Sequence, residues 1–517
     1  MTPGSKAVLI LLVLIIQAFY WAPSAKPIDK VQEIRIAETA REMAASDNWI
    51  VPYYNGELRL QKPPLPYWLT AASYKIFGTV NEFSARFASA TFAALTVFLL
   101  WWWINRALGL SSAVSTSIGF ISSYIALRYF RSGEADAILL FFVTAACIIV
   151  YDLLFMKATL KRVLLLHLCM GLGFLAKGPA AIAIPLVTLL WFALKNRQFD
   201  VLKKCLHPAG LLILLVTGFG WYGLIFYTMP EQANLFVSGQ IDSTFITGNH
   251  PNPFYWYIPH LFEFFAPWSV FIIPAAIWLY KTPSHPPAVN YAAAWFIATF
   301  IMLSLNVNKQ VQYGLLLAPP LMILLGHYLA SAAAGYARIN KIILISLITV
   351  TALALVVIFF KWEGIQDFPA GKMLLLLTGC LLPFAVAKLL RYNEPTRYRE
   401  LLLAGIMVSG WIYGQFHLYH APGGKGDLKQ FALAAKDYSP LFIYTEADPR
   451  LSFYIERVIP VMKDEQDMLP ILDKFDTLYL ITEGERFNPA GKIFITKIIG
   501  NEKFSLWKLT QKNLSEN

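Results

Sequence analysis

The sequence has few charged residues, few cysteines and no internal repeats, and each of these features excludes some classes of protein. Only 15% of its 517 residues are charged, against roughly a quarter in soluble proteins, while 57% are hydrophobic. This balance excludes a soluble globular domain and indicates a polytopic membrane protein. The four cysteines have no metal-ligand spacing and lie outside the C-terminal region, so neither a structural disulfide nor a zinc–thiolate site is expected.

Apolar runs long enough to cross a bilayer recur through residue 418 and predict about thirteen transmembrane helices. We expect the first run to be a retained helix, because no clear signal-peptide cleavage site follows it closely. Lys177-Gly178-Pro179 divides one long apolar run, since Gly-Pro breaks or kinks a helix. The predicted spans lie near 7–24, 84–104, 110–127, 136–156, 162–176, 179–196, 209–228, 262–280, 288–305, 313–333, 340–360, 371–390 and 401–418.

The net charge of +11 comes mostly from short loops, which indicates membrane topology rather than a nucleic-acid partner. When the short loops are assigned alternately to the two sides, those of one side hold about sixteen Lys and Arg and those of the other side six. By the positive-inside rule, the richer set is cytoplasmic. Residues 25–83, 128–135, 229–261 and the C-terminal region should then face the periplasm of a multi-pass bacterial inner-membrane protein.

The composition becomes polar from about residue 421. Short β-type runs alternate there with helical segments, which predicts a small α/β soluble domain at 421–517. The expected fold is therefore a polytopic α-helical membrane domain at 1–420, with an outer juxtamembrane loop at 25–83, followed by this domain. The β-type runs are 441–445, 458–462, 477–482 and 493–499, and the helical segments are 428–436 and 465–474.

Two charged residues stand out in the loop at 25–83. Glu33 lies on a helix-compatible, amphipathic segment, where it is either an acid at the mouth of a membrane cavity or a solvated surface charge. Lys62 begins Lys-Pro-Pro-Leu-Pro-Tyr-Trp, and the rigid prolines fix it just before a second surface helix at 67–77. A lysine held there suits an anionic lipid headgroup, and the alternative is a snorkelling membrane anchor.

Further candidates lie in the later outer loops. Asp136 begins an apolar span, where a carboxylate is costly and indicates function, although a helix N-cap is the alternative. Lys177 and Lys309 are outward-facing cations, while a lone histidine such as His250 is more often structural than a metal ligand. Acids and cations gathered on one membrane face suit group transfer from a phosphate-bearing lipid.

An ordered set of motifs resembles the aminoarabinose transferase and protein O-mannosyltransferase superfamily of integral-membrane GT-C glycosyltransferases. The likeness covers about the first 330 residues, and only the layout of the chain is similar beyond them. The motifs are Glu33–Met43, Trp49-Ile-Val-Pro, Asn55-Gly56, Lys62–Leu69, Phe77-Gly78, Arg86, Asp136, Leu-Ala-Lys177-Gly-Pro, Pro267-Trp268, and Lys309 with Tyr313.

The resemblance implies an inverting glycosyltransferase that uses a polyprenyl-phosphate sugar donor outside the cytoplasm. The acceptor would be a lipid, such as lipid A, ranked above a protein hydroxyl. Glu33 and Asp136 would be the catalytic carboxylates. Nothing in the pattern requires a metal, and a divalent metal is left open. The substrate-binding residues would be Lys62, Arg86, Lys177, His250, Lys309 and Tyr313.

The chain departs from the family pattern at one position. The family usually has Asp-Glu at the start of the first surface helix, whereas this chain has Gln32-Glu33. An amide cannot act as a general base. Glu33 could replace the missing acid, Asp29 could do so from one helical turn earlier, or the chain could be a non-catalytic paralogue that binds carrier lipid. A lipid or sugar transporter is a further alternative, but such proteins usually contain internal repeats.

Overall fold

The chain divides into two compact units, each assembled from separate segments. The first, here called the membrane unit, comprises Met1–Trp21, Leu60–Pro66 and Ala88–Tyr413, and the second, the α/β unit, comprises Ala22–Arg59, Tyr67–Phe87 and Gly414–Asn517. Most of the predicted loop at 25–83 therefore shares a unit with the predicted domain at 421–517. The computed structural model describes residues 2–234, 251–331, 334–363, 370–392, 395–420, 426–444, 446, 448–463, 468–483, 492–499 and 502–510.

Nine helices within the described residues are long and apolar enough to cross a membrane. A tenth results if Tyr257–Phe264 and Trp268–Lys281, which bend by 118° at their junction, count as one span. The polytopic helical fold is therefore confirmed, whereas the number thirteen stays a prediction. Two of the predicted spans correspond to the shorter apolar helices Leu110–Ser122 and Ala180–Lys195.

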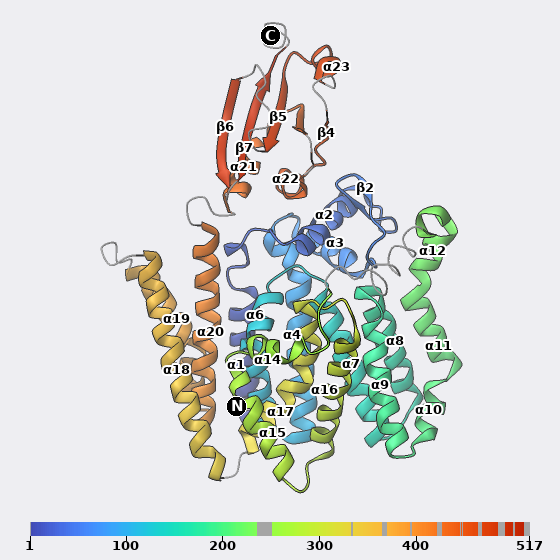
Figure 1. The fold of residues 1–517 in the computed structure, drawn as a ribbon, viewed down its shortest axis with the longest axis vertical. Helices are drawn as coiled ribbons and strands as arrows, with labels where there is room; N and C mark the ends of the chain where they lie inside the picture. The colour runs from blue at the N-terminus through green and yellow to red at the C-terminus, as the bar shows by residue number, and fades with distance from the viewer. Residues whose placement is uncertain are drawn as a thin grey trace. The chain divides into compact units, whose positions relative to one another are not determined.

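The helices of the membrane unit are drawn in Figure 1, where α7, α8 and α9 run side by side, and each of the three contacts the other two. Two helices extend into the α/β unit, α4 at its start and α20 at its end. The described helices are α1 (Pro3–Ile15), η1 (Ile16–Tyr20), α4 (Glu82–Leu108), α5 (Leu110–Ser122), α6 (Tyr124–Tyr129), α7 (Asp136–Phe155), α8 (Leu160–Lys177), α9 (Ala180–Lys195), α10 (Phe199–Cys205), α11 (Pro208–Leu214), η3 (Leu215–Phe219), α12 (Gly220–Thr228), α14 (Tyr257–Phe264), η5 (Trp268–Phe271), α15 (Ile272–Lys281), α16 (Pro287–Leu305), η6 (Val311–Leu317), α17 (Ala318–Ser331), α18 (Ala334–Glu363), α19 (Ala370–Leu389) and α20 (Pro395–His420).

The predicted break between the fifth and sixth apolar runs is confirmed. Helix α8 ends at Lys177, and α9 begins at Ala180. Gly178 has φ of +100°, a conformation that a residue with a side chain rarely adopts, and Pro179 cannot donate a backbone hydrogen bond. This break in the helix leaves Lys177 as the last residue of α8.

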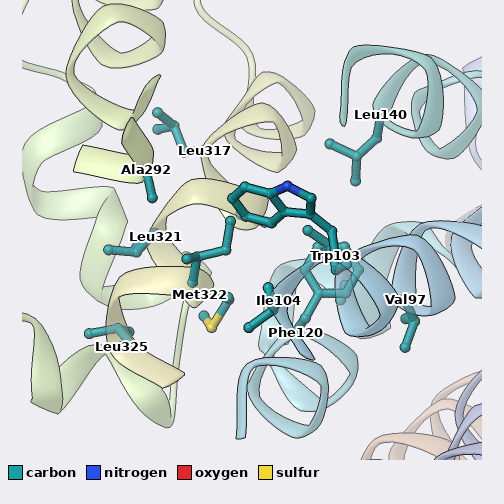
Figure 2. Close-up of a cluster of buried hydrophobic side chains, with 14 of the residues drawn as sticks. Val97, Trp103, Ile104, Phe120, Leu140, Ala292, Leu317, Leu321, Met322 and Leu325 are labelled. Atoms are coloured by element: carbon teal, nitrogen blue, oxygen red, sulfur yellow. The ribbon is translucent and has the colours of Figure 1, made fainter. Parts of the chain in front are cut away.

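The core of the membrane unit is formed by large apolar side chains from α4, α5, α7, α16 and α17. Figure 2 shows Trp103 of α4 in the middle of this cluster, near Leu321 and Met322 of α17. Helices α5 and α17 approach closely at Gly326, where a Cβ atom would lie 2.2 Å from Thr116 Oγ1 and 2.5 Å from its backbone nitrogen. Only glycine fits at this crossing.

The α/β unit contains a five-stranded sheet in the order β4-β3-β5-β7-β6. Strand β3 is parallel to β4 and β5, whereas β7 pairs antiparallel with both β5 and β6. The prediction from the sequence contained four of these strands and lacked β7. The elements are η2 (Pro23–Ala25), α2 (Val31–Ser46), β1 (Tyr53–Tyr54), β2 (Glu57–Leu58), α3 (Leu65–Phe77), α21 (Gly426–Ala435), β3 (Leu441–Tyr444), α22 (Pro449–Ile455), β4 (Val461–Met462), α23 (Leu469–Leu472), β5 (Leu478–Glu483), β6 (Lys492–Ile499) and β7 (Glu502–Leu509).

A hairpin that the sequence analysis did not predict joins α2 to α3. Strands β1 and β2 pair antiparallel around Asn55-Gly56, and both of these residues have positive φ. Asn-Gly is a strong hairpin signal because both residues tolerate positive φ. Glu42 of α2 holds the turn, since its carboxylate accepts the backbone N–H of Asn55 at 2.5 Å and that of Gly56 at 3.1 Å.

Candidate active site

A buried ion pair lies where two helices of the membrane unit end. Asp136 is the first residue of α7 and Lys177 the last residue of α8, and Lys177 Nζ is 2.5 Å from Asp136 Oδ2. Their side chains are only 5% and 17% exposed. The structure thus brings together two predicted site residues that are 41 positions apart in the sequence.

A tyrosine and a second carboxylate surround this pair. Lys177 Nζ lies 5.6 Å from the ring centroid of Tyr313, which η6 carries. Glu134 is buried and close enough to act electrostatically on Lys177, and it accepts a hydrogen bond from Ser132 Oγ at 2.8 Å. The sequence analysis missed Glu134, although its place two residues before Asp136 in a short loop between apolar spans was a usable signal.

Lys309 is buried on the segment that leads into η6. Its ammonium donates to the backbone carbonyl of Asn252 at 3.1 Å and to that of Asn306. Within the part of the chain that the structure describes, Lys309 has no ion pair with a carboxylate. A buried cation whose partners are neutral carbonyls can still attract an anion, and a phosphate is suited to such a position.

Lys62 belongs to the membrane unit, although the segments on both sides of it belong to the α/β unit. It is partly exposed and lies in a bend just before α3, as the prolines predicted. Lys62 therefore shares a unit with Asp136, Lys177 and Lys309. His250 lies outside the described residues.

Glu33 and Arg86 form a second buried ion pair, and this pair belongs to the α/β unit. Arg86 Nε donates to Glu33 Oε1 at 2.6 Å, and the two side chains are 4% and 0% exposed. The guanidinium also donates to the carbonyls of Lys26 at 2.6 Å, Pro27 at 3.2 Å and Pro23. Arg86 thereby fixes the segment that precedes α2, with Glu33 as its counter-ion.

Asp29, considered as an alternative acid, is joined to this segment. Its carboxylate accepts the hydroxyl of Tyr419 at 2.9 Å and pairs with Lys26 Nζ at 2.7 Å. Burial lowers the pKa of Lys26, although the carboxylates of Glu33 and Asp29 oppose this effect. The start of α2 is thus a network of alternating charges, which stabilises local structure.

The described residues contain no group of three or more His, Cys, Asp or Glu side chains placed to hold a metal ion. Among the described side chains of this region, Asp136 and Glu134 can act as acids or bases, and Lys177 and Lys309 supply positive charge. The hydroxyl of Tyr257 and the carbonyl of Gln310 border this region, and the hydroxyl donates to that carbonyl at 3.3 Å.

Comparison with known sequences gives a family match and several relatives. The profile of the dolichyl-phosphate-mannose-protein mannosyltransferase family matches residues 61–221. An undecaprenyl phosphate-alpha-4-amino-4-deoxy-L-arabinose arabinosyl transferase of Shewanella sediminis is 29% identical over 63% of this chain and 61% of its own length. An enzyme of the same description from Proteus mirabilis is 30% identical over 57% of this chain. The chain spans 54% of that relative's length.

A solved structure matches nearly the whole chain. The crystal structure of ArnT from Cupriavidus metallidurans, bound to undecaprenyl phosphate, superposes with a TM-score of 0.77 over 98% of both chains. The two sequences are 19% identical, so this likeness concerns the fold. The predicted fold class is confirmed, namely a GT-C-like bundle of transmembrane helices with a small C-terminal α/β region.

Proposed function

We propose that this chain is a GT-C glycosyltransferase of the aminoarabinose transferase and protein O-mannosyltransferase type and that it transfers a sugar from a polyprenyl-phosphate carrier. The acceptor would be a lipid of the lipid A kind, or less favourably a protein, on the periplasmic face of a bacterial inner membrane. The names of the relatives and the undecaprenyl phosphate bound to the ArnT structure support this donor class. The buried Asp136–Lys177 pair beside Tyr313 carries the proposal.

Asp136 would act as the general base. An acceptor hydroxyl attacks the anomeric carbon of the donor sugar, the bond from that carbon to the phosphate oxygen breaks, and the hydroxyl proton passes to the carboxylate. One displacement of this kind inverts the anomeric configuration. A positioned base of this type typically accelerates a reaction by about 10²–10⁴-fold.

The lysines would stabilise the phosphate that leaves with the carrier lipid. Lys309 is the most suitable, because its partners in the described structure are carbonyls rather than carboxylates. Lys177 would lie between the phosphate and Asp136, and Lys62 is carried by the same unit. Fixed cations aimed at developing negative charge lower a barrier without reorganising during the reaction.

Glu33 and Arg86 are proposed as positioning residues. The catalytic role predicted for Glu33 stays a prediction, and its complete burial against Arg86 favours a structural contribution. Arg86 uses its donors on Glu33 and on three backbone carbonyls, which leaves the guanidinium little capacity for substrate. Gln32, the departure from the family pattern, is next to this buried pair on α2.

Transfer of radiolabelled sugar from a panel of polyprenyl-phosphate sugars to membrane lipid and protein tests the proposal. Wild type should give a labelled product, while Asp136→Asn and Lys309→Met should each lower kcat by about 10²-fold or more. Lys75→Met is the matched control, because Lys75 is an exposed lysine paired with exposed Asp47. Full activity in Asp136→Asn would refute the assigned base. Bound carrier lipid without any product in wild type would favour the non-catalytic paralogue.

A further inference from the structure

A polar pocket of about 210 Å³ is lined by residues of the α/β unit. Its walls come from three places in the sequence, namely the segment before α2, the end of α20 and the first turns of α21. The pocket is smaller than the roughly 300–1,000 Å³ that drug-sized ligands occupy, so it suits a group about as large as one sugar ring. The lining residues are Ser24, Pro27, Tyr419, Asp427, Lys429, Gln430 and Leu433.

The lining offers hydrogen-bond donors and acceptors in similar measure. Lys429 contributes an ammonium and Asp427 a carboxylate, and Glu82, which pairs with Lys429, adds a second carboxylate behind the lining. Ser24 and Gln430 can both donate and accept, while Pro27 and Leu433 supply apolar surface. A polyhydroxyl ring matches this mixture, because each hydroxyl donates and accepts while the C–H groups meet apolar walls.

Buried contacts fix the walls of the pocket. Tyr419 donates its hydroxyl to Asp29 at 2.9 Å, which directs its oxygen lone pairs away from that carboxylate. Lys429 Nζ is 2.5 Å from Glu82, whose carboxylate also accepts the hydroxyl of Tyr454 at 3.1 Å. Lys429 has three N–H donors, so this ion pair orients the ammonium without using all of them.

Hydrogen bonds to the backbone fix the segment that carries Ser24 and Pro27. Arg86 donates to the carbonyl of Pro27, and also to those of Pro23 and Lys26. The N–H of Ile28, the next residue, donates to Tyr454 Oη at 2.8 Å. A pocket with walls fixed by buried hydrogen bonds loses little conformational freedom when a ligand binds.

We propose that this pocket binds a sugar of a membrane-anchored glycolipid acceptor, an inference that rests on the proposed function. Tyr419 is the last residue of the candidate membrane span Arg397–Tyr419, so the pocket lies where that span ends. A lipid-anchored ligand presents its first sugars at such a level. Because the carboxylates of Asp427 and Glu82 outnumber the ammonium of Lys429, the pocket favours a neutral or amino sugar over a phosphate.

Two variants on α21 test the pocket. Leu433→Trp fills it, and the matched control is Ala434→Trp, because Ala434 is the next exposed residue of the same helix and does not line the pocket. Asp427→Asn keeps the size of the side chain and removes its charge, which covers the case in which Leu433→Trp fails to fold. Binding of methyl β-glucoside and methyl β-glucosaminide to the full chain in nanodiscs is measured by saturation-transfer NMR.

The expected result is that one of the two methyl glycosides binds wild type and Ala434→Trp but loses its signal in Leu433→Trp and Asp427→Asn. In the transfer assay, those two variants should raise the KM for the glycolipid acceptor about 5–10-fold, while kcat and the donor KM stay unchanged. The inference is overturned if neither glycoside binds, if Leu433→Trp binds as wild type does, or if the donor KM changes instead. Absence of transfer in wild type would refute the proposed function and still leave the binding result readable.

Discussion

The buried Arg86–Glu33 pair allows a quantitative prediction about the segment that precedes α2. In the variant Arg86→Met, the apolar part of the side chain is kept, whereas the buried carboxylate of Glu33 loses one cationic partner and three carbonyls lose a donor. Breaking a buried ion pair by removing one partner costs about 3–5 kcal/mol. A carbonyl that water cannot reach adds roughly 1–3 kcal/mol. We therefore expect the free energy of local opening of segment 23–34 to be lower in Arg86→Met than in wild type by at least about 3 kcal/mol.

Hydrogen–deuterium exchange of the full chain measures this opening. A loss of about 3–5 kcal/mol corresponds to exchange that is faster by roughly two to four orders of magnitude at the amides of residues 23–34. The double variant Arg86→Met/Glu33→Gln removes the buried charge as well, so it should lose less than the sum of the two single variants. Unchanged exchange in Arg86→Met would refute the reasoning.

The control is an exposed arginine of the same helix. Arg106 pairs with Asp152 but is 38% exposed, and such pairs contribute about 0–1 kcal/mol, so Arg106→Met should leave exchange nearly unchanged. The experiment also separates the two roles considered for Glu33. If Glu33 positions the segment, Glu33→Gln should lower transfer and accelerate exchange together. If it is a catalytic carboxylate, transfer should fall while exchange stays as in wild type.

Three further predictions concern single positions. Gly326→Ala would place a Cβ atom against Thr116, and we expect it to destabilise the membrane unit by about 1–3 kcal/mol, measured as a lower Tm, whereas an unchanged Tm would contradict the close approach. Burial raises the pKa of Glu38 to about 7 despite its pairing with Arg41. The infrared band of the protonated Glu38 carboxyl, identified by its loss in the variant Glu38→Gln, should therefore disappear as the pH rises through about 7. A Glu38 carboxyl that is already ionised at about pH 5 would contradict this prediction. Because the unfolded Glu38 has a pKa near 4.3, the folded chain holds the extra proton, and stability should fall as the pH rises from about 4 to about 7. Gln32→Asp should change transfer by less than about tenfold, and activity that appears only in this variant would support the non-catalytic paralogue.

Local chemistry allowed much of the fold to be predicted from the sequence. The apolar runs defined the spans because a bilayer requires a fixed length of apolar helix. The break after Lys177 was predictable because Gly178 and Pro179 act on the backbone at their own positions. The hairpin at Asn55-Gly56 had an equally local signal, which the sequence analysis did not use for that purpose.

The sequence also gave the types of the candidate site residues, since a carboxylate next to an apolar span is costly wherever the chain places it. It did not give their partners. Asp136 pairs with Lys177 across 41 positions, and Glu33 pairs with Arg86 across 53. Pairs of this kind depend on which helix ends meet, and no local pattern encodes that.

Composition and periodicity alone identify a polytopic membrane protein with a polar α/β region, because both follow from the solvent that each segment meets. The tertiary structure alone decided that Glu33 and Arg86 belong to the α/β unit, while Asp136, Lys177 and Lys309 belong to the membrane unit. The local sequence around a charged residue is the same whether its side chain is solvated, paired with another charge or directed at a substrate. Only the packing of distant segments selects among these states, by fixing which buried charges find a counter-ion and which are left with neutral carbonyls.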